Sequence, residues 1–294
     1  MFGKKRASDP VAKETRQLEV PPPSAFEIDA SVQTDKGCVR EINEDSGRLV
    51  RPNDAGLLAN RGLLLVVADG MGGHSAGEVA SQMAVDLISR LYYQSQGDAH
   101  AALRDAVAEA NRRIFAAAAA DESKRGMGTT CTALAIRGGE ATIAHVGDSR
   151  CYMVRGGDIY QLTEDHSAVM EMVRHGLITK EEARHHEDKN VILRALGTTP
   201  EVEVAMTEPF GVREGDRLLL CSDGLHDLVV DEELAAALAG AEDLHAACEQ
   251  LIELAKERGG HDNITVGIVG VVPPGTVAAE AKDAPATREV EAAR

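Results

Sequence analysis

The sequence LLLVVADGMGGH, from Leu63 to His74, sets the pattern on which this chain is built. Its apolar, partly β-branched run predicts a buried strand, and that strand delivers Asp69 straight into a glycine-bearing turn. The pattern recurs in ATIAHVGDSR and RLLLCSDGLHD, and it is reversed in GGHDNITVGIV, where the acid precedes the strand. We therefore expect a converging group of acids at the exposed ends of buried strands, formed by Asp69, Asp148, Asp223 and Asp262.

Such a group of carboxylates predicts a metal site. Carboxylates gathered on a hydrophobic scaffold repel one another and are costly to desolvate, so they persist mainly when a cation neutralises them. Oxygen ligands suit a hard ion such as Mg²⁺ or Mn²⁺, whereas zinc would recruit His or Cys at close spacing, which the adjacent pair His185 and His186 lacks. The alternative is that each Asp before a Gly is only a turn residue. That alternative is much weaker for four acids together than for any one of them.

Composition predicts one domain between two polar tails. Seven of the ten prolines lie outside residues 26–272, so breakers of regular structure are concentrated at the ends. We expect a single domain at 26–272, with disordered tails at 1–25 and 273–294. No apolar run of 18 or more residues occurs, and no apolar stretch follows the basic triplet at 4–6, which argues against a membrane span or a signal peptide.

Net charge and cysteine content restrict which binding partners and which cellular compartment we expect. With 48 acidic and 31 basic residues the formal charge is −17, which opposes binding to nucleic acid or to an anionic membrane. The five cysteines are spread through apolar segments without C-x2-C spacing, so we expect them to be reduced. These features predict a cytoplasmic protein, and we expect it to be a monomer.

Apolar periodicity predicts an α+β fold. Strands are expected at 26–34, 62–68, 129–136, 141–146, 151–154, 159–162, 217–222 and 264–271. Helices are expected around 79–91, at 99–120 and at 243–257. Two consecutive helices and hairpin-like strand pairs do not fit βαβ crossovers, so we expect antiparallel sheets covered by helices. The polar stretch 165–190 is expected to be a helical excursion beside the acids, either ordinary surface or a substrate gate.

The segment GCVREINEDS adds a phosphate-binding group to the predicted metals. Two oxygen-ligated divalent ions can activate a water and neutralise charge that develops during displacement at phosphorus. Arg40 carries a planar, five-donor group that can clamp a phosphate, and Asp45 is a further acid. An Arg close to an Asp is a weak signal alone, and it gains weight from the four aspartates.

Together these motifs resemble the metal-dependent protein phosphatase family (PPM, type 2C) in its compact bacterial form. They occur in the family's order and span about Gln33 to Val269. The matching segments are Arg40-x-x-Asn43-Glu44-Asp45, Asp69-Gly70-Met71-Gly72-Gly73-His74, Gly126-Met127-Gly128-Thr129-Thr130, Gly147-Asp148-Ser149-Arg150, Leu162-Thr163-x-Asp165-His166, Ser222-Asp223-Gly224 and His261-Asp262-Asn263.

The resemblance implies a fold, an activity and partners. The fold would be a central antiparallel β-sandwich flanked by pairs of helices, with a small helical flap at about 165–190. The activity would be hydrolysis of phosphoserine or phosphothreonine with Mn²⁺ or Mg²⁺ and without a phosphoenzyme intermediate. Phosphoproteins would be the substrates, and a cognate Ser/Thr protein kinase would be the partner whose action this chain opposes.

The resemblance also implies a set of metal ligands. By position, Asp69 would bridge two metals, and the carbonyl of Gly70 would bind one of them. Asp223 and Asp262 would bind the other metal. Asp148 and Asp223 match a third, weaker site seen in bacterial members of the family.

Three further residues are expected beside the metals. Asp45 would act through metal-bound water, and Arg40 would hold the substrate phosphate. Many eukaryotic members carry a general-acid His directly after Asp-Gly, whereas this chain has Met71 there. The nearest imidazole is His74, which is either a proton donor or a helix N-terminal His with no catalytic role. The candidate catalytic residues are therefore Arg40, Asp69 and His74.

Three other functions compete with metal-dependent protein phosphatase activity. Cys131 and Arg137 fit the C-x5-R pattern of cysteine-dependent phosphatases, but the residues between them alternate as in a strand, which would hold the two about 20 Å apart. A phosphate cradle needs a tight loop instead. A phosphoprotein-binding scaffold without hydrolysis would have lost at least one acid. A hydrolase of small phosphate esters stays open, because the metals contact mainly the phosphoryl group.

Overall fold

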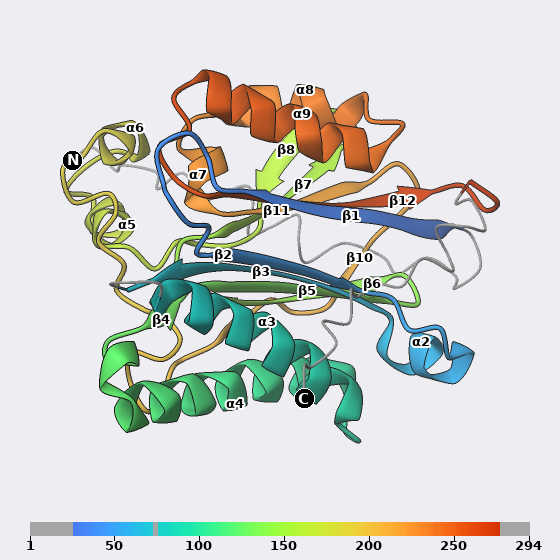
Figure 1. Ribbon diagram of the computed structural model, residues 1–294. Coiled ribbons are helices and arrows are strands. Elements are labelled where there is room, and N and C mark those ends of the chain that lie inside the picture. Colours follow the sequence, from blue (N-terminus) through green and yellow to red (C-terminus); the bar gives the residue numbers. More distant parts are fainter. Residues whose placement is uncertain (1–25, 73–75, 277–294) are drawn as a thin grey trace, which may run out of the picture.

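The computed structural model describes residues 26–72 and 76–276, and it has the α+β architecture that the sequence predicts. Two antiparallel sheets pack face to face, and helices cover the outer face of each sheet (Figure 1). The prediction of disordered tails falls outside the described residues, apart from 273–276. Within the described ranges, no helix has the length and apolar character needed to cross a membrane.

The first sheet has five strands in the order β1-β12-β11-β7-β8. Its longest pairing joins β1 to β12, with Glu27 opposite Val272 and Asp35 opposite Ile264. All nine residues of β12 are buried, as the unbroken apolar run of the last strand predicts. The strands are β1 (Glu27–Asp35), β12 (Ile264–Val272), β11 (Arg217–Cys221), β7 (Arg150–Arg155) and β8 (Asp158–Gln161).

The second sheet has the main order β10-β6-β5-β3-β2, with β4 paired to β3 and β9 paired to β6. The pairings β2–β3, β3–β5 and β5–β6 are antiparallel and place the C-terminal ends of β3 and β6 at one edge. The strands are β10 (Phe210–Gly211), β6 (Glu140–Val146), β5 (Cys131–Arg137), β3 (Leu63–Met71), β2 (Asp45–Val50), β4 (Gly128–Thr129) and β9 (Ala205–Met206).

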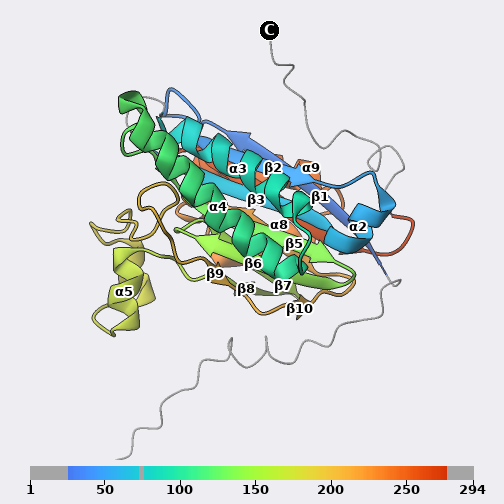
Figure 2. The same ribbon diagram turned by 90° about the horizontal axis from the view of Figure 1, so that it is seen from below.

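Long helices cover both sheets. Figure 2 shows α3 (Ala76–Gln94) and α4 (Ala99–Ala120) crossing the seven-stranded sheet, and Figure 1 shows α8 (Asp231–Ala239) and α9 (Leu244–Glu257) on the other side. The helix α9 begins where the Asp243 side chain accepts from the amides of His245 and Ala246, and it buries Leu244, Cys248, Leu251, Ile252 and Ala255 against the sheet. The shorter helical segments are α2 (Ala55–Arg61), η2 (Glu122–Lys124), α5 (Ala168–Arg174), α6 (Lys180–Arg184) and α7 (Asp223–His226).

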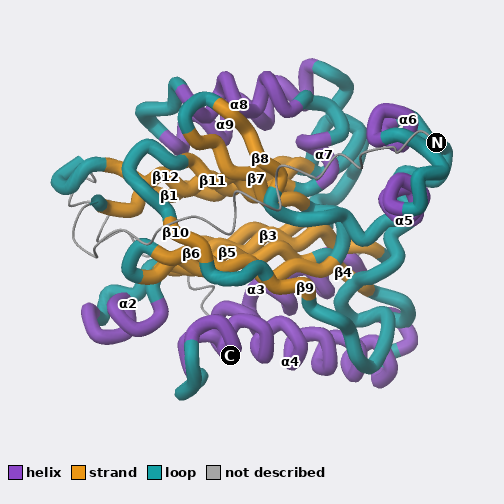
Figure 3. The backbone as a smooth tube through the Cα atoms, turned by 180° about the vertical axis from the view of Figure 1, so that it is seen from behind, coloured by secondary structure: helices purple, strands orange, loops and turns teal. Residues whose placement is uncertain are grey.

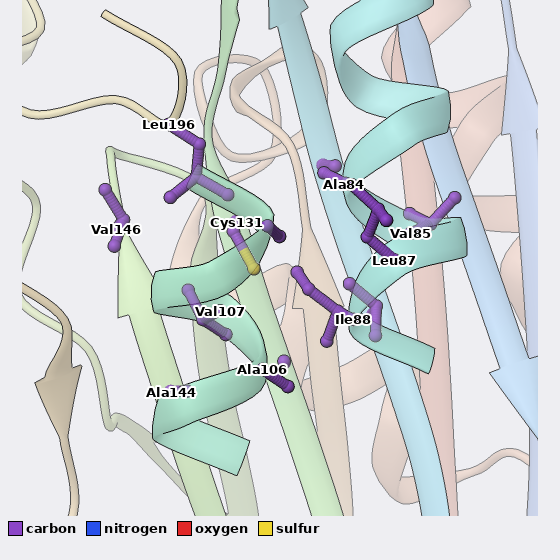
Figure 4. Close-up of a cluster of buried hydrophobic side chains, with 14 of the residues drawn as sticks. Ala84, Val85, Leu87, Ile88, Ala106, Val107, Cys131, Ala144, Val146 and Leu196 are labelled. Carbon is purple, nitrogen blue, oxygen red and sulfur yellow. The ribbon is translucent and has the colours of Figure 1, made fainter. Parts of the chain in front are cut away.

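Three apolar clusters fill the layers. One lies between α3, α4 and the seven-stranded sheet, one between α7, α8, α9 and the five-stranded sheet, and one between the two sheets. Figure 4 shows part of the first cluster, where Ile88 of α3 and Val107 of α4 pack near Cys131 of β5. This layering gives the four-layer arrangement, and its rigidity fixes the strand ends that carry the acids.

One prediction made from the sequence was wrong, and one strand of the main sheet was missed. Asp69 does not end its strand: β3 continues through Met71, because Gly70 and Met71 pair with β4. The strand β2 was not expected at all, because DSGRLV lacks clear alternation. Gly47 explains its composition, since a Cβ there would lie 2.6 Å from Cγ2 of Val32 in the facing sheet, so the close approach of the sheets requires glycine.

Candidate metal centre

The four aspartates come from both sheets and meet at one end of the sandwich. Asp69 lies in β3, and Asp148 lies in the turn between β6 and β7. Asp223 is the first residue of α7, directly after β11, and Asp262 lies two residues before β12. The antiparallel pairings place these strand ends at the same end of the sandwich. Figure 3 also shows α5, α6 and α7 at that end.

The carboxyl groups lie close enough for their charges to affect one another. Burial, followed by the charges of Asp45, Asp223, Asp148 and Asp262, holds the pKa of Asp69 well above its usual range. Burial and the charges of neighbouring acids, Asp148 first, likewise raise the pKa of Asp223. Burial also raises the pKa values of Asp45 and Asp148 to about 6 each. Repulsion of this kind is what a bound cation would relieve.

Orphaned carboxylate oxygens support a metal ion at this place. Oδ1 of Asp148 and Oδ1 of Asp223 are buried without a hydrogen-bond partner. Oε1 of Glu44 is also buried and unpartnered, and sequence reasoning missed this residue, although the run Asn43-Glu44-Asp45 carried the signal. Buried acceptors without donors are rare and have lone pairs available for a cation. The donor set therefore fits a hard divalent ion.

Side chains alone do not complete a metal site in the described part of the chain. Within the described ranges, no three His, Cys, Asp or Glu side chains form a compact metal-binding group by themselves. Mg²⁺ keeps several waters beside its carboxylate ligands, so waters would have to complete the site.

Hydrogen bonds with hydroxyl and amide groups hold Asp45 and Asp69 in position. Ser222 donates to Oδ2 of Asp45 at 2.7 Å, and its own oxygen accepts from the amide of Thr265 at 2.9 Å. The hydroxyl of Thr130 accepts from the amide of Asp69 at 2.9 Å, and the amide of Thr130 donates to the Asp69 carbonyl at 2.8 Å. Ser222 therefore positions the Asp45 carboxylate, and Thr130 positions the backbone of Asp69.

Arg40 stands at the rim of this group of acids. Its Nη2 donates to Oδ2 of Asp262 at 2.8 Å, and the Arg40 side chain is half exposed. Asn263 shapes the loop that carries it: Nδ2 donates to the carbonyls of Lys36 and Ile42, and Oδ1 accepts from the amide of Glu44 at 2.8 Å. The structure thus brings Arg40 to the acids, and a guanidinium there can hold an anion.

Gly70 lies where only a glycine fits. A Cβ at this position would come within 2.2 Å of the Gly77 carbonyl oxygen and 2.4 Å of the Glu44 carbonyl oxygen. The Gly70 amide donates to that same Glu44 carbonyl at 3.1 Å. Glycine therefore lets β3, the Glu44 loop and the start of α3 approach one another closely. The remaining predicted site residue, His74, lies outside the described residues.

Comparison with known proteins identifies the family. A family model described as protein phosphatase 2C matches residues 45–263. This chain belongs to the protein phosphatase 2C family. The serine/threonine phosphatase stp of Listeria welshimeri is 40% identical over 246 residues, which cover 82% of this chain and 94% of that protein. PstP of Mycobacterium tuberculosis is 42% identical over 243 residues, which cover 82% of this chain and 45% of that longer protein.

Solved structures of the protein phosphatase 2C family agree in fold. The crystal structure of M. tuberculosis PstP/Ppp has a TM-score of 0.74 and 40% identity, covering 83% of this chain and 99% of that one. The catalytic domain of PstP in complex with two manganese ions has a TM-score of 0.73 and 40% identity, covering 84% and 99%. The predicted α+β sandwich is confirmed, and this protein phosphatase 2C is a metal-dependent serine/threonine protein phosphatase.

The rival cysteine mechanism is contradicted in this protein phosphatase 2C. Cys131 is fully buried in the apolar cluster of Figure 4, and burial raises the pKa of its thiol to about 12. Arg137 lies at the opposite end of β5 and forms a surface ion pair with Glu140 at 3.7 Å. A thiol that stays protonated and lies far from the arginine cannot attack a phosphate that the arginine binds.

Two buried histidines of this protein phosphatase 2C lie behind the strand ends, and one of them contacts Asp148. His226 was missed by sequence reasoning, because a His in a short helix after Asp223 carries no motif of its own. It is buried, and its Nε2 lies 3.1 Å from the carbonyl oxygen of Asp148. His145 is also buried, with Nδ1 3.0 Å from the Thr132 hydroxyl and its ring 4.9 Å from that of His166.

Proposed function

We propose that this protein phosphatase 2C removes phosphate from phosphoserine and phosphothreonine of phosphoproteins at the end of the sandwich where the aspartates meet. The observation that carries the proposal is the set of buried, unpartnered carboxylate oxygens at the end of the sandwich where Arg40 contacts Asp262. A group of acids prepared for cations, with an exposed guanidinium at its rim, is suited to bind a phosphate together with divalent ions.

The proposed ligands are those that the family's motifs mark in this chain. Asp69 and the Gly70 carbonyl would hold one Mn²⁺ or Mg²⁺, and Asp69, Asp223 and Asp262 would hold the second. Asp148 and Asp223 would provide a third, weaker site, to which their unpartnered Oδ1 atoms are suited. The two manganese ions in the complex of the PstP catalytic domain support this number of ions.

The ions would supply an activated water and neutralise charge at the phosphoryl group. The chain's own residues do the remaining work. Arg40 uses one nitrogen on Asp262, which leaves other guanidinium donors for the phosphate oxygens. The buried Asp45 is held by Ser222 and would act through metal-bound water. The reaction forms a bond between a water oxygen and phosphorus, breaks the bond to the Ser or Thr oxygen, and returns a proton to that oxygen. His74 is the proposed donor of that proton.

The proposal includes a cognate reaction and a compartment. Phosphoserine and phosphothreonine in proteins are made by phosphoryl transfer, so a Ser/Thr protein kinase must supply the substrate. We place the protein in the cytoplasm as a monomer. Its five cysteines are all free, and four of them are buried, which suits a reducing compartment.

Single-turnover hydrolysis of a phosphothreonine peptide tests the proposal. We expect activity with added Mn²⁺, loss of activity with a chelator, at least a hundredfold loss in Asp223→Asn, and retention in Cys131→Ser, the matched control for a nucleophilic thiol. A folded, manganese-loaded wild type that hydrolyses no phosphopeptide would overturn the proposal. Binding of phosphopeptides without hydrolysis would then indicate a scaffold, and turnover of p-nitrophenyl phosphate alone would indicate a small-ester hydrolase.

A further inference from the structure

A chain of contacts joins the flap, residues 165–190, to the loop that carries Asp148. Nζ of Lys189 lies 2.5 Å from Oδ2 of Asp227, the residue that follows α7. Oδ1 of Asp227 lies 3.5 Å from Nδ1 of His226, which is not a hydrogen bond and is an ion pair only when both ring nitrogens carry protons. The Nε2 of His226 lies 3.1 Å from the carbonyl oxygen of Asp148, and because a carbonyl can only accept, Nε2 is the donor. The contacts therefore run from Lys189 on the flap to the backbone of the loop that carries Asp148.

A second ion pair joins the flap to the same part of the chain. Nη2 of Arg184, at the end of α6, lies 3.3 Å from Oδ1 of Asp231, the first residue of α8. Figure 1 and Figure 3 both show α6 and α7 at the same end of the sandwich. The base of the flap is fixed separately, since Ala168 donates to the Val191 carbonyl and Leu193 donates to the His166 carbonyl.

The position of Asp227 gives the first ion pair its effect. Asp227 is about one helical turn after Asp223, and its charge is among those that act on the Asp223 carboxyl group. With Lys189 in contact, the negative charge of Asp227 is compensated from the flap side. If the flap moves away, that carboxylate is left uncompensated beside an already acidic site, and His226 loses a defined neighbour.

We propose that Lys189, Asp227 and His226 form a positioning relay through which the docked flap holds the loop of Asp148 in place. Arg184 and Asp231 form the second attachment of the docked flap. None of the three relay residues touches the reacting atoms, so they act through Asp148 rather than on the substrate. The link to catalysis rests on the proposed function, because it requires Asp148 to be a metal ligand, whereas the link between flap and loop does not.

Amide hydrogen exchange tests the relay without any activity measurement. We expect Lys189→Gln to speed exchange about two- to fivefold in the flap and also at residues 145–150, the factor that corresponds to loss of one exposed ion pair. Lys189→Arg should retain the wild-type exchange. Lys180→Gln is the matched control, because it removes a flap lysine for which the described part of the chain offers no ion pair. Faster exchange in the flap with unchanged exchange at 145–150 would overturn the relay.

A second pair of variants examines the inner end of the relay. His226→Gln keeps an amide N–H able to reach the Asp148 carbonyl, whereas His226→Leu does not. We expect His226→Leu to speed exchange at 145–150 in the folded protein and His226→Gln to preserve the wild-type rate. Equal rates in Gln and Leu variants would contradict a hydrogen-bonded relay.

Kinetics with Mn²⁺ then separate this inference from the proposed function. For Lys189→Gln we expect the Mn²⁺ concentration that gives half-maximal activity to rise about two- to fivefold, with kcat at saturating Mn²⁺ within about twofold of wild type. If the Mn²⁺ concentration that gives half-maximal activity stayed the same, the flap would not affect metal binding through the loop of Asp148. If the wild type showed no phosphatase activity while the exchange result held, the proposed function would fail and the relay would stand.

Discussion

Asp45 and Asp69 stand directly opposite each other on the neighbouring antiparallel strands β2 and β3. Two acids in such a cross-strand pair repel each other, and the charge of Asp262 acts on both of them as well. The fold therefore places two like charges opposite each other at the proposed metal site. The following predictions test this arrangement and the parts of the structure that support it.

Removing the charge of Asp69 is expected to stabilise the protein when metal is absent. The variant Asp69→Asn relieves repulsion that holds the pKa of this carboxyl well above its usual range, so the free energy of unfolding in chelator should rise by about 1 kcal/mol or more. Urea unfolding in chelator measures this. Asp158→Asn, at the exposed first position of β8, is the control and should change little. A less stable Asp69→Asn would speak against carboxylate repulsion.

With added Mn²⁺ we expect the wild type to be more stable than Asp69→Asn. An ion that binds only the folded state at about a hundred times its dissociation constant adds about 2.7 kcal/mol. For a domain of this size that corresponds to a rise in Tm of about 5–10 °C for wild type. Asp69→Asn should show a much smaller rise in the same differential scanning measurement. Equal rises in both proteins would mean that Asp69 is not a ligand.

The buried ion pair between Arg150 and Asp165 is expected to be important for stability. Arg150 donates through Nε and Nη2 to both oxygens of Asp165 at 2.7–3.0 Å, and Gln161 donates to Oδ1 as well. Asp165→Ala leaves the guanidinium buried without its partner, so we expect about 3 kcal/mol of destabilisation by urea unfolding.

The control for that variant is Glu109→Ala in α4, which removes the exposed pairs of Glu109 with Arg112 and Arg113. It should cost under about 1 kcal/mol. Similar losses in Asp165→Ala and Glu109→Ala would show that burial of the first pair has no special effect.

His145 is expected to make the protein sensitive to acid. Burial, followed by the neighbouring His166, lowers the pKa of His145 to about 4, whereas the unfolded value is about 6.5. Between these values the unfolded state binds more protons, so this contribution to stability is complete above pH 6.5 and is lost as pH falls towards 4. At about pH 5 the loss should be about 2 kcal/mol.

Comparison of wild type with His145→Gln isolates that contribution. The raised pKa values of Asp45 and Asp148 act in the opposite direction, stabilising the metal-free protein as pH falls through about 6, and they are present in both proteins. Urea unfolding in chelator at about pH 7.5 and pH 5 should therefore show a smaller acid-induced loss in His145→Gln. An identical loss in the two proteins would exclude His145 as the cause.

Much of the fold could be predicted because its elements have strong local signals. The helix α4 occupies 99–120 and β11 begins at Arg217, as apolar periodicity indicates. The strand β2 could not be predicted, because its structure depends on Gly47 lying against Val32 of the other sheet. The same holds for the end of β3, since only pairing with β4 carries the strand past Asp69 to Met71.

The sequence by itself determined the chemical character of the site: acids delivered by buried apolar strands, an arginine suited to phosphate, and the motifs of one family. Only the tertiary structure decided which atoms meet. Asp45 faces Asp69 because two strands pair, the Glu44 amide donates to Oδ1 of Asn263 across 219 residues of chain, and Lys189 reaches Asp227 across 38 residues. Local patterns specify strands and turns, whereas contacts between distant segments depend on the packing of the two sheets.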